Sequence, residues 1–238
     1  NGKMGKFVYS SAKEQNINVI CGVDKTKSDY TVCPVYSSFD KVTQTTDVVV
    51  DFSSPSCLFG LLDYCVSTKT PLVICTTGYS SDDEKEILNA SETIPILKTA
   101  NTSLGVSLFI KTVTDIAAKL PDYDIEIIEK HHNQKKDSPS GTAKRIIDSL
   151  VKTRKNSSVV YGRNGSNARE SGEIGVHSVR GGSVVGEHSV YFFGKSDFIS
   201  ITHSALDKKV FADGAIEAAR FITTKTKGLY SEKDLFGV

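Results

Sequence analysis

The sequence predicts an α/β fold in its first part and an α+β fold with a mixed sheet in its second part. Over residues 1–100, apolar runs of strand length alternate with helical patterns, which is typical of a parallel sheet covered on both faces. After residue 103, strand-like segments follow one another across short turns, which indicates an antiparallel or mixed sheet. The 238 residues suffice for two modest domains.

In the first part, residues 3–15 predict a short helix, and the apolar run 17–23 predicts a strand that ends before Asp24. Pro55 suits the first turn of the next helix, and Ser80 or Ser81 can cap the one after it. Further strands are predicted at 48–53, 71–78 and 93–100, with helices at 55–68 and 80–91.

In the second part, the pattern predicts helices at 103–120, 138–153 and 209–228, and strands at 123–132, 174–182, 183–194 and 197–205. We expect a dinucleotide-binding domain from residues 1–102 and 212–238, and a substrate-binding and oligomerisation domain from residues 103–211. The chain opens with NGKMG, which reads like the middle of a motif. We therefore expect that the first strand of the first domain is missing.

Composition narrows the class of protein. The 29 basic and 28 acidic residues give a net charge of +1, which argues against nucleic acid or an anionic membrane as the main partner. No apolar stretch approaches the ~20 residues of a membrane span. The five cysteines are odd in number and show no CxxC spacing, so we expect reduced thiols and a cytoplasmic protein.

A glycine turn precedes the first predicted helix. Gly2 and Gly5 would leave backbone N–H groups free to hold a pyrophosphate. Asp24 follows Gly2 by 22 residues, which suits an acid that binds a ribose hydroxyl, and Lys25 could hold a 2′-phosphate. The alternative is an ordinary glycine turn with a surface Asp-Lys pair. Thr76–Gly78 and residues 99–103 also follow predicted strands, where ligands sit in such sheets.

The run EKHHNQKKDSPSGTA, residues 129–143, carries the densest chemistry. His131 and His132 end a predicted strand, Lys135 follows, and Ser140–Thr142 open a helix whose N-terminus can bind a carboxylate or phosphate. A metal site is a weaker hypothesis, because the positive charges of the lysines beside the histidines would repel a metal cation. The plainest alternative is a helix cap after a surface loop. We favour an anion-binding turn with acid–base groups beside it.

These residues resemble the dihydrodipicolinate reductase family, whose signature is E-x-H-H-x-x-K-x-D-x-P-S-G-T-A. The likeness extends over essentially the whole chain. Further matching segments are GKMG (2–5), CTTG (75–78), TANTSLGV (99–106), VRGGSVVGEH (179–188) and ITHSA (201–205). Cys75 replaces a common glycine, and Thr102 stands where many members have an aromatic residue.

The resemblance implies a Rossmann-like nucleotide-binding domain, a substrate and tetramerisation domain, and a cytoplasmic homotetramer. It implies NADPH- or NADH-dependent reduction of 4-hydroxy-tetrahydrodipicolinate, a cyclic dicarboxylate, in diaminopimelate and lysine biosynthesis. His131 would be the acid–base residue and Lys135 the proton donor, although either could deliver the proton. Substrate contacts would come from His132, Gly141 and Thr142, with Ser140 at the same helix start. Cofactor contacts would come from Gly2, Lys3, Met4, Asp24, Lys25, Cys75, Thr76, Thr77, Gly78, Thr99, Ala100, Asn101 and Thr102.

Two rival functions are weighed against this one. Another nicotinamide-dependent dehydrogenase, such as a semialdehyde dehydrogenase, would need a catalytic cysteine and would leave the Ser-Gly-Thr turn without a role. A non-catalytic dinucleotide-binding sensor would keep the glycine turn but would have no need of the His-His-Lys run.

Overall fold

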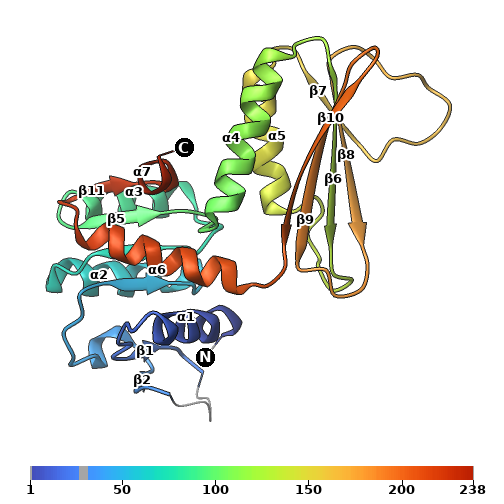
Figure 1. Ribbon diagram of the computed structural model, residues 1–238. Helices are drawn as coiled ribbons and strands as arrows, with labels where there is room; N and C mark the ends of the chain where they lie inside the picture. The colour runs from blue at the N-terminus through green and yellow to red at the C-terminus, as the bar shows by residue number, and fades with distance from the viewer. Residues whose placement is uncertain (1, 27–31, 238) are drawn as a thin grey trace. The chain divides into compact units, whose positions relative to one another are not determined.

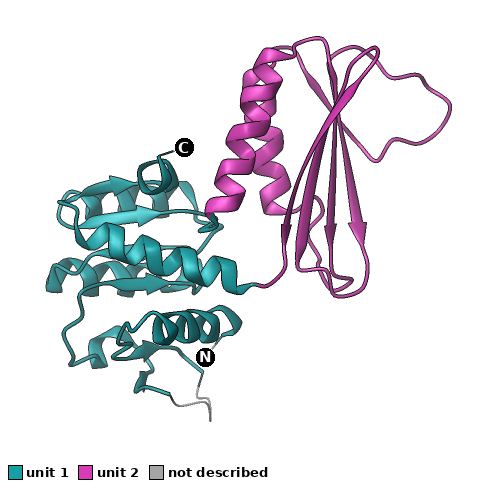
Figure 2. Ribbon diagram, in the orientation of Figure 1, with its two compact units in different colours: residues 1–103, 208–238 teal, residues 104–207 magenta. Residues whose placement is uncertain are grey.

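The computed structural model describes residues 2–26 and 32–237. The chain forms two compact units (Figure 2): unit 1 comprises residues 1–103 and 208–238, and unit 2 comprises residues 104–207. From the sequence, the domain boundaries were expected after residues 102 and 211. The second boundary lies earlier in the structure, because helix α6 (Lys209–Thr223) packs against elements of unit 1.

Unit 1 is built on a four-stranded parallel sheet with the order β11-β5-β4-β3 (Figure 1). Helices α2 (Leu58–Thr68) and α3 (Ser81–Ser91) pack on one face, and α6 packs on the other. The sequence prediction of a parallel sheet covered on both faces is therefore confirmed. The strands are β3 (Val49–Asp51), β4 (Leu72–Ile74), β5 (Pro95–Lys98) and β11 (Gly228–Tyr230).

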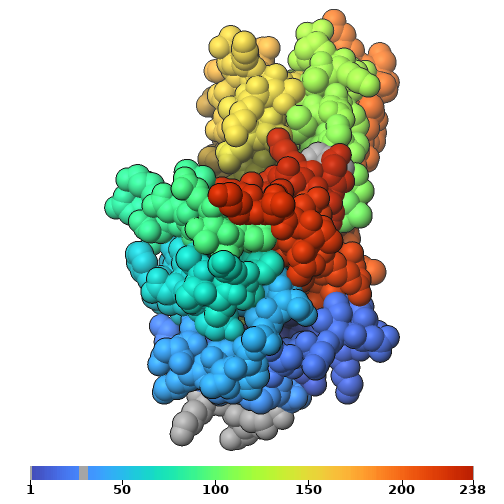
Figure 3. Space-filling view, turned by 90° about the vertical axis from the view of Figure 1, so that its left-hand side faces the viewer, coloured from blue at the N-terminus to red at the C-terminus, as the bar shows by residue number. Residues whose placement is uncertain are grey.

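β11 adds a parallel strand to the β5 edge of the sheet. In Figure 3 the C-terminal segment, coloured red, lies at the surface beside a green segment of unit 1. β11 continues into the short helix α7 (Glu232–Phe236). Neither β11 nor α7 was predicted from the sequence. β3 and β4 are as short, but each lies in an apolar run, whereas β11 follows the polar stretch TKTK and has no such run to mark it.

The run 17–23 was predicted as one strand, but only β1 (Gly22–Val23) is formed. It pairs with the two-residue strand β2 (Val35–Tyr36) in a separate two-stranded sheet. A ladder extends only as far as its partner, so the remaining apolar residues are extended without strand pairing. Helix α1 (Lys3–Glu14) follows Gly2 and packs against α6.

Two short 3-10 turns complete unit 1, η1 (Phe39–Lys41) and η2 (Pro55–Cys57). Pro55 begins η2, which leads directly into α2, as its fixed φ allows. Ser80 is the N-cap of α3, and its hydroxyl and the Asp83 carboxylate form a reciprocal capping box. Of the two serines expected to cap this helix, Ser80 is thus the N-cap, and an acidic first turn follows it.

Unit 2 is a five-stranded mixed sheet with the order β10-β9-β6-β8-β7, covered on one face by two helices. The β6–β8 and β8–β7 pairs are parallel, and the β6–β9 and β9–β10 pairs are antiparallel. The elements are α4 (Leu104–Lys119), β6 (Asp124–His131), α5 (Gly141–Thr153), β7 (Ser158–Tyr161), β8 (Glu173–Arg180), β9 (Gly186–Phe193) and β10 (Phe198–Ala205).

Candidate active site

The inward face of β6 changes from apolar to charged along its length. Ile125 and Ile127 are buried in the core, and the next residues on the same face are Glu129 and His131. Both polar residues remain buried, with 0% and 8% exposure. Buried polar side chains of this kind are kept by hydrogen bonds, so their partners define the site.

The Glu129 carboxylate has two donors on each oxygen. Arg180 on β8 binds it as a fork, with both Nη–O distances at 2.7 Å. Nδ1 of His131 lies 2.6 Å from Oε2, and the backbone N–H of Ser140 donates to Oε1 at 3.1 Å. Burial raises the pKa of Glu129, but hydrogen bonds from His131 and Arg180 outweigh it and hold the pKa well below its usual range. The carboxylate is therefore ionised.

His131 is oriented by this carboxylate. An ionised carboxylate can only accept, so Nδ1 carries the hydrogen, and Nε2 is the ring nitrogen that does not contact Glu129. Nε2 lies beside Gly186 at the start of β9, where a Cβ atom would come within 3.1 Å of it. The absence of a side chain at position 186 leaves space next to Nε2.

His188 on β9 forms the other side of the cluster. Its ring lies edge-on to that of His131, with the centroids 5.3 Å apart. Burial and the nearby His131 lower the pKa of His188 to about 4, so this imidazole is neutral near pH 7. Its Nε2 lies 2.8 Å from the Ser140 hydroxyl oxygen, which also accepts from the Ala143 N–H to cap α5. The Ser140 side chain, predicted as a substrate contact, is thus engaged within the protein.

The loop between β6 and α5 carries the remaining predicted residues. His132 is half-buried, and its backbone N–H donates to the Val184 carbonyl at 2.8 Å. The Lys135 ammonium pairs with Asp137 at 2.8 Å, and its side chain is 20% exposed. Gly141 and Thr142 begin α5, where no atom lies within 4 Å of a Cβ placed on Gly141. Unit 2 therefore places Lys135 and the open α5 start on one short loop that follows His131.

Over residues 2–26 and 32–237, no cluster of three or more His, Cys, Asp or Glu side chains has the arrangement of a metal site. The same residues include no helix long and apolar enough to cross a membrane. The cysteines of the chain are unpaired thiols.

The predicted cofactor residues lie in unit 1. Gly2 is the N-cap residue of α1, whose first turn, with Lys3 and Met4, contains no acidic side chain. No atom lies within 4 Å of a Cβ placed on Gly2. Asp24 follows β1 and accepts from the Thr26 N–H at 2.8 Å, which lowers its pKa. An uncapped helix start and an ionised acid after the next strand fit the pyrophosphate and ribose of a dinucleotide.

Lys25 is exposed and reaches across to the loop after β3. Its ammonium donates to the Ser56 hydroxyl at 3.3 Å, and Ser56 lies 2.9 Å from the Ser54 hydroxyl. This contact is between flexible exposed side chains, so it costs little to break. The ammonium can therefore turn to a phosphate at the end of β1.

In the loop after β4, the groups accessible to a ligand are mainly the backbone and the exposed residues Thr77 and Gly78. Cys75 is partly buried, and burial strongly raises the pKa of its thiol, which disfavours the reactive thiolate form. The Thr76 hydroxyl accepts from the Ser53 N–H at 2.9 Å. Gly78 has φ of +88°, a conformation that favours glycine.

The loop after β5 directs most of its side chains inward. The Thr99 hydroxyl contacts the Asn101 carbonyl at 2.8 Å and Glu232 at 2.6 Å. Asn101 and Thr102 are buried as well, whereas Ala100 is exposed. The side chains of Thr99, Asn101 and Thr102 are therefore engaged in hydrogen bonds within the protein.

Comparison with known proteins adds independent evidence. Family models for the dihydrodipicolinate reductase N-terminus and C-terminus match residues 1–102 and 105–236. A 4-hydroxy-tetrahydrodipicolinate reductase from Clostridium tetani is 44% identical over 97% of this chain and 92% of its own length. One from Clostridium novyi is 42% identical over 99% of this chain and 94% of its own length.

A dihydrodipicolinate reductase from Paenisporosarcina sp. TG-14, solved with dipicolinate bound, has the same fold with a TM-score of 0.80. It is 24% identical and covers 97% of this chain and 94% of that one. A probable dehydrogenase from Thermotoga maritima shares the fold more distantly, with a TM-score of 0.59 and 9% identity over 99% of this chain and 90% of that one.

A parallel α/β unit with a dinucleotide-type glycine turn, joined to a unit with a buried acid–base cluster, defines an oxidoreductase that uses NADH or NADPH. The family models and relatives narrow this class. The chain belongs to the dihydrodipicolinate reductase family, as the motif resemblance predicted.

No role was predicted from the sequence for Glu129, Arg180, His188 or Gly186. A signal for Glu129 was present, because it occupies an inward position in the alternating strand DIEIIEKH. A charged residue at such a position needs a partner. The identity of that partner depends on which strands flank β6, and this was not readable from the pattern.

Proposed function

We propose that this chain reduces 4-hydroxy-tetrahydrodipicolinate to tetrahydrodipicolinate, with loss of water, in diaminopimelate and lysine biosynthesis. The observation that carries the proposal is the His131 imidazole held by Glu129 with Nε2 facing the gap at Gly186. The proposal is also supported by the family models, which match both units of the chain. NADPH or NADH supplies the hydride when bound.

Unit 2 binds the substrate in this proposal. A carboxylate of the substrate lies against the N–H groups of Gly141 and Thr142, which open α5 without an acidic residue in its first turn. Lys135 supplies the matching positive charge and His132 a hydrogen bond. Ser140 acts indirectly, as the cap that fixes the helix start. The dipicolinate bound by the Paenisporosarcina relative is a planar dicarboxylate of the expected kind.

The proton is handled by His131 and Lys135. After hydride transfer the ring must gain a proton, and both an imidazolium and an ammonium can donate one. Asp137 neutralises Lys135 while the site is free. A substrate carboxylate would compete for the same ammonium, so one lysine can both bind the anion and donate the proton.

Unit 1 binds the cofactor in this proposal. Gly2, Lys3 and Met4 hold the pyrophosphate, Asp24 holds the ribose, and Lys25 meets the 2′-phosphate of NADPH. The loops at Cys75–Gly78 and Thr99–Thr102 hold the nicotinamide side through their backbones.

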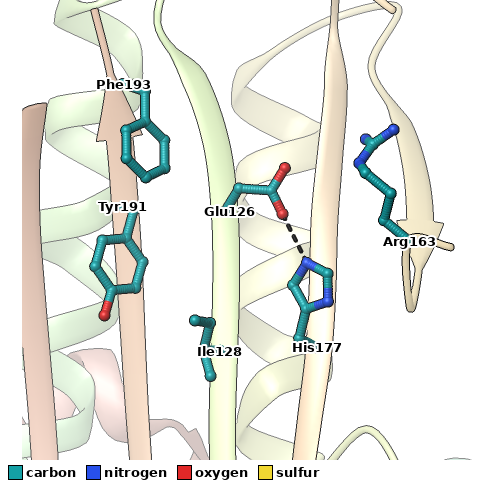
Figure 4. A pocket seen from close by; sticks show the side chains of 6 residues that line it. All are labelled: Glu126, Ile128, Arg163, His177, Tyr191 and Phe193. Atoms are coloured by element: carbon teal, nitrogen blue, oxygen red, sulfur yellow. Dashed lines mark hydrogen bonds and ion pairs between the residues drawn. The ribbon is translucent and has the colours of Figure 1, made fainter. Parts of the chain in front are cut away.

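The molecule is further proposed to be a cytoplasmic homotetramer assembled through unit 2. The helices α4 and α5 cover one face of its sheet, and the opposite face, called the open face here, carries Ile128, Tyr191 and Phe193 (Figure 4). Phe193 stacks with Tyr191 and contacts Phe198, and both phenylalanines are exposed, by 40% and 61%. A contiguous exposed aromatic patch is typical of an interface. Light scattering should give four chains, and Phe198→Glu should lower that mass.

The activity is tested with freshly made product of dihydrodipicolinate synthase. The chain should consume NADPH or NADH, followed by nicotinamide absorbance, only when this substrate is present. Binding of NADPH without turnover would instead support a dinucleotide sensor. Turnover of other substrates, with this one ignored, would support a different dehydrogenase.

A further inference from the structure

We infer that Glu129 is a positioning residue for His131: its carboxylate fixes the imidazole with Nδ1 protonated, so that Nε2 exchanges the proton with the substrate. The inference rests on the proposed acid–base role of His131 and deepens it. It extends the proposed site to a residue that contacts neither the substrate carboxylates nor the cofactor in the proposal above.

Geometry leaves the Glu129 carboxylate little freedom. Both oxygens bind Arg180 on β8, and one also accepts from the Ser140 backbone at the start of α5, so groups from two other parts of unit 2 hold the carboxylate in place. The His131 ring cannot turn over without giving up its 2.6 Å contact to this buried acceptor. Breaking this contact would remove one hydrogen-bond donor from a carboxylate that is 0% exposed. Such a loss costs about 1–3 kcal/mol or more.

The tautomer follows from the inventory of donors. Arg180 and the Ser140 N–H can only donate, so the carboxylate is the acceptor in every contact it makes. The hydrogen on Nδ1 is therefore committed to Glu129. In the neutral ring, Nε2 has the lone pair, and in the charged ring it has the proton that can leave.

The same carboxylate connects His131 to the proposed anion site. Its Oε1 accepts from Ser140, whose side chain caps α5 and contacts His188. The Glu129 carboxylate therefore fixes the position of the His131 imidazole relative to the start of α5. A change at Glu129 should disturb proton transfer more than cofactor binding, since the cofactor residues lie in unit 1.

Other charged or titratable groups lie near His131 or its neighbour His188 on the surrounding elements. Arg180 lies on β8, His188 on β9, His203 on β10, and Lys135 and Asp137 on the loop before α5. A pH profile alone would mix their titrations. The test therefore reads the two ring nitrogens of His131 directly.

Nitrogen NMR of the full chain labelled with ¹⁵N-histidine distinguishes protonated from unprotonated ring nitrogens, and a His131→Ala sample assigns the signal. In the wild type, neutral His131 should show a protonated Nδ1 and an unprotonated Nε2. The variant Glu129→Gln replaces an acceptor with an amide that can donate to Nδ1, so the signal should move toward the other tautomer. Its kcat should fall about 100-fold, the lower range for a general acid–base group, with a smaller change in KM.

The matched control is Glu126→Gln. Glu126 lies on the same strand and also contacts a histidine and an arginine, His177 at 2.9 Å and Arg169, but on the opposite face of the sheet. This variant should leave the His131 signals and kcat close to wild type. If Glu129→Gln does not fold, Glu129→Asp keeps a charge for Arg180 while withdrawing the oxygen from Nδ1, and the same two measurements apply.

A wild-type His131 with Nε2 protonated and Nδ1 bare would overturn the inference, as would a folded Glu129 variant with unchanged kcat. Glu126→Gln shifting the His131 signals as much as Glu129→Gln would also overturn it. Failure of the proposed function would look different. In that case the wild type would not turn over the substrate at all, although the NMR signals could still report the Nδ1–H tautomer.

Discussion

Replacement of Lys135 by Ala tests the central assignment of the site. The Lys135 side chain is 20% exposed, and its ammonium pairs with Asp137 at 2.8 Å. Loss of a charged hydrogen bond to a substrate carboxylate costs about 1.5–3 kcal/mol, which is about a 10- to 150-fold rise in KM. Loss of a proton donor costs about 10²- to 10⁴-fold in kcat. Together, kcat/KM should fall about 10³-fold or more.

The rise in KM of Lys135→Ala should have a second cause. Without Lys135, the Asp137 carboxylate remains beside the proposed anion site and repels the substrate. The double variant Lys135→Ala, Asp137→Asn should therefore recover part of the KM while kcat stays low. If Lys135 contributed only its positive charge and no proton, kcat of the double variant would recover as well.

Steady-state consumption of NADPH, read by absorbance with saturating cofactor, separates kcat from KM. Cofactor affinity, measured by fluorescence without substrate, should stay near wild type because Lys135 belongs to unit 2. Lys136→Ala is the matched control, since this neighbouring lysine is exposed and has no assigned role. Normal turnover by Lys135→Ala, or an equal loss in Lys136→Ala, would refute the assignment.

Lys25, Gly214 and His188 give further expectations. Lys25→Ala should weaken NADPH more than NADH in binding titrations; equal effects would exclude a 2′-phosphate role. In Gly214→Ala, the new Cβ would lie 1.7 Å from the Thr102 carbonyl oxygen, so urea unfolding should show a loss of about 1–3 kcal/mol and cofactor affinity should fall; an unchanged free energy of unfolding would contradict the close approach. The pKa of His188 is lowered to about 4, so the unfolded state binds its proton first and stability is lost as pH falls from about 6.5 toward 4. His188→Gln should make that pH dependence shallower by up to about 1.4 kcal/mol per pH unit; an unchanged slope would show that this imidazole is not buried neutral.

Long local patterns were readable from the sequence because their periodicity is set by neighbours in the chain. The helices near 3–14, 104–119 and 209–223 and the strand at 124–131 appear close to where they were expected. The two-residue strand β2 and the three-residue strand β11 were not found, since no apolar run marks either of them in the sequence. The prediction for the apolar run 17–23 failed for a different reason, because its partner β2 pairs with only two of its residues.

The run 129–143 illustrates the division most clearly. By itself the sequence determined that His131, Lys135 and the Ser140–Thr142 turn lie on consecutive parts of one strand–loop–helix segment, since their spacing is local. Only the tertiary structure decided what holds them. Arg180 and His188 are 51 and 48 residues distant from Glu129 and Ser140, and the strand order that places β6 between β8 and β9 brings them together. The pairing of strands is a long-range outcome of packing, so no local pattern specifies that Arg180 holds the Glu129 carboxylate. The contact between Glu129 and the His131 imidazole, by contrast, joins neighbours on one strand face.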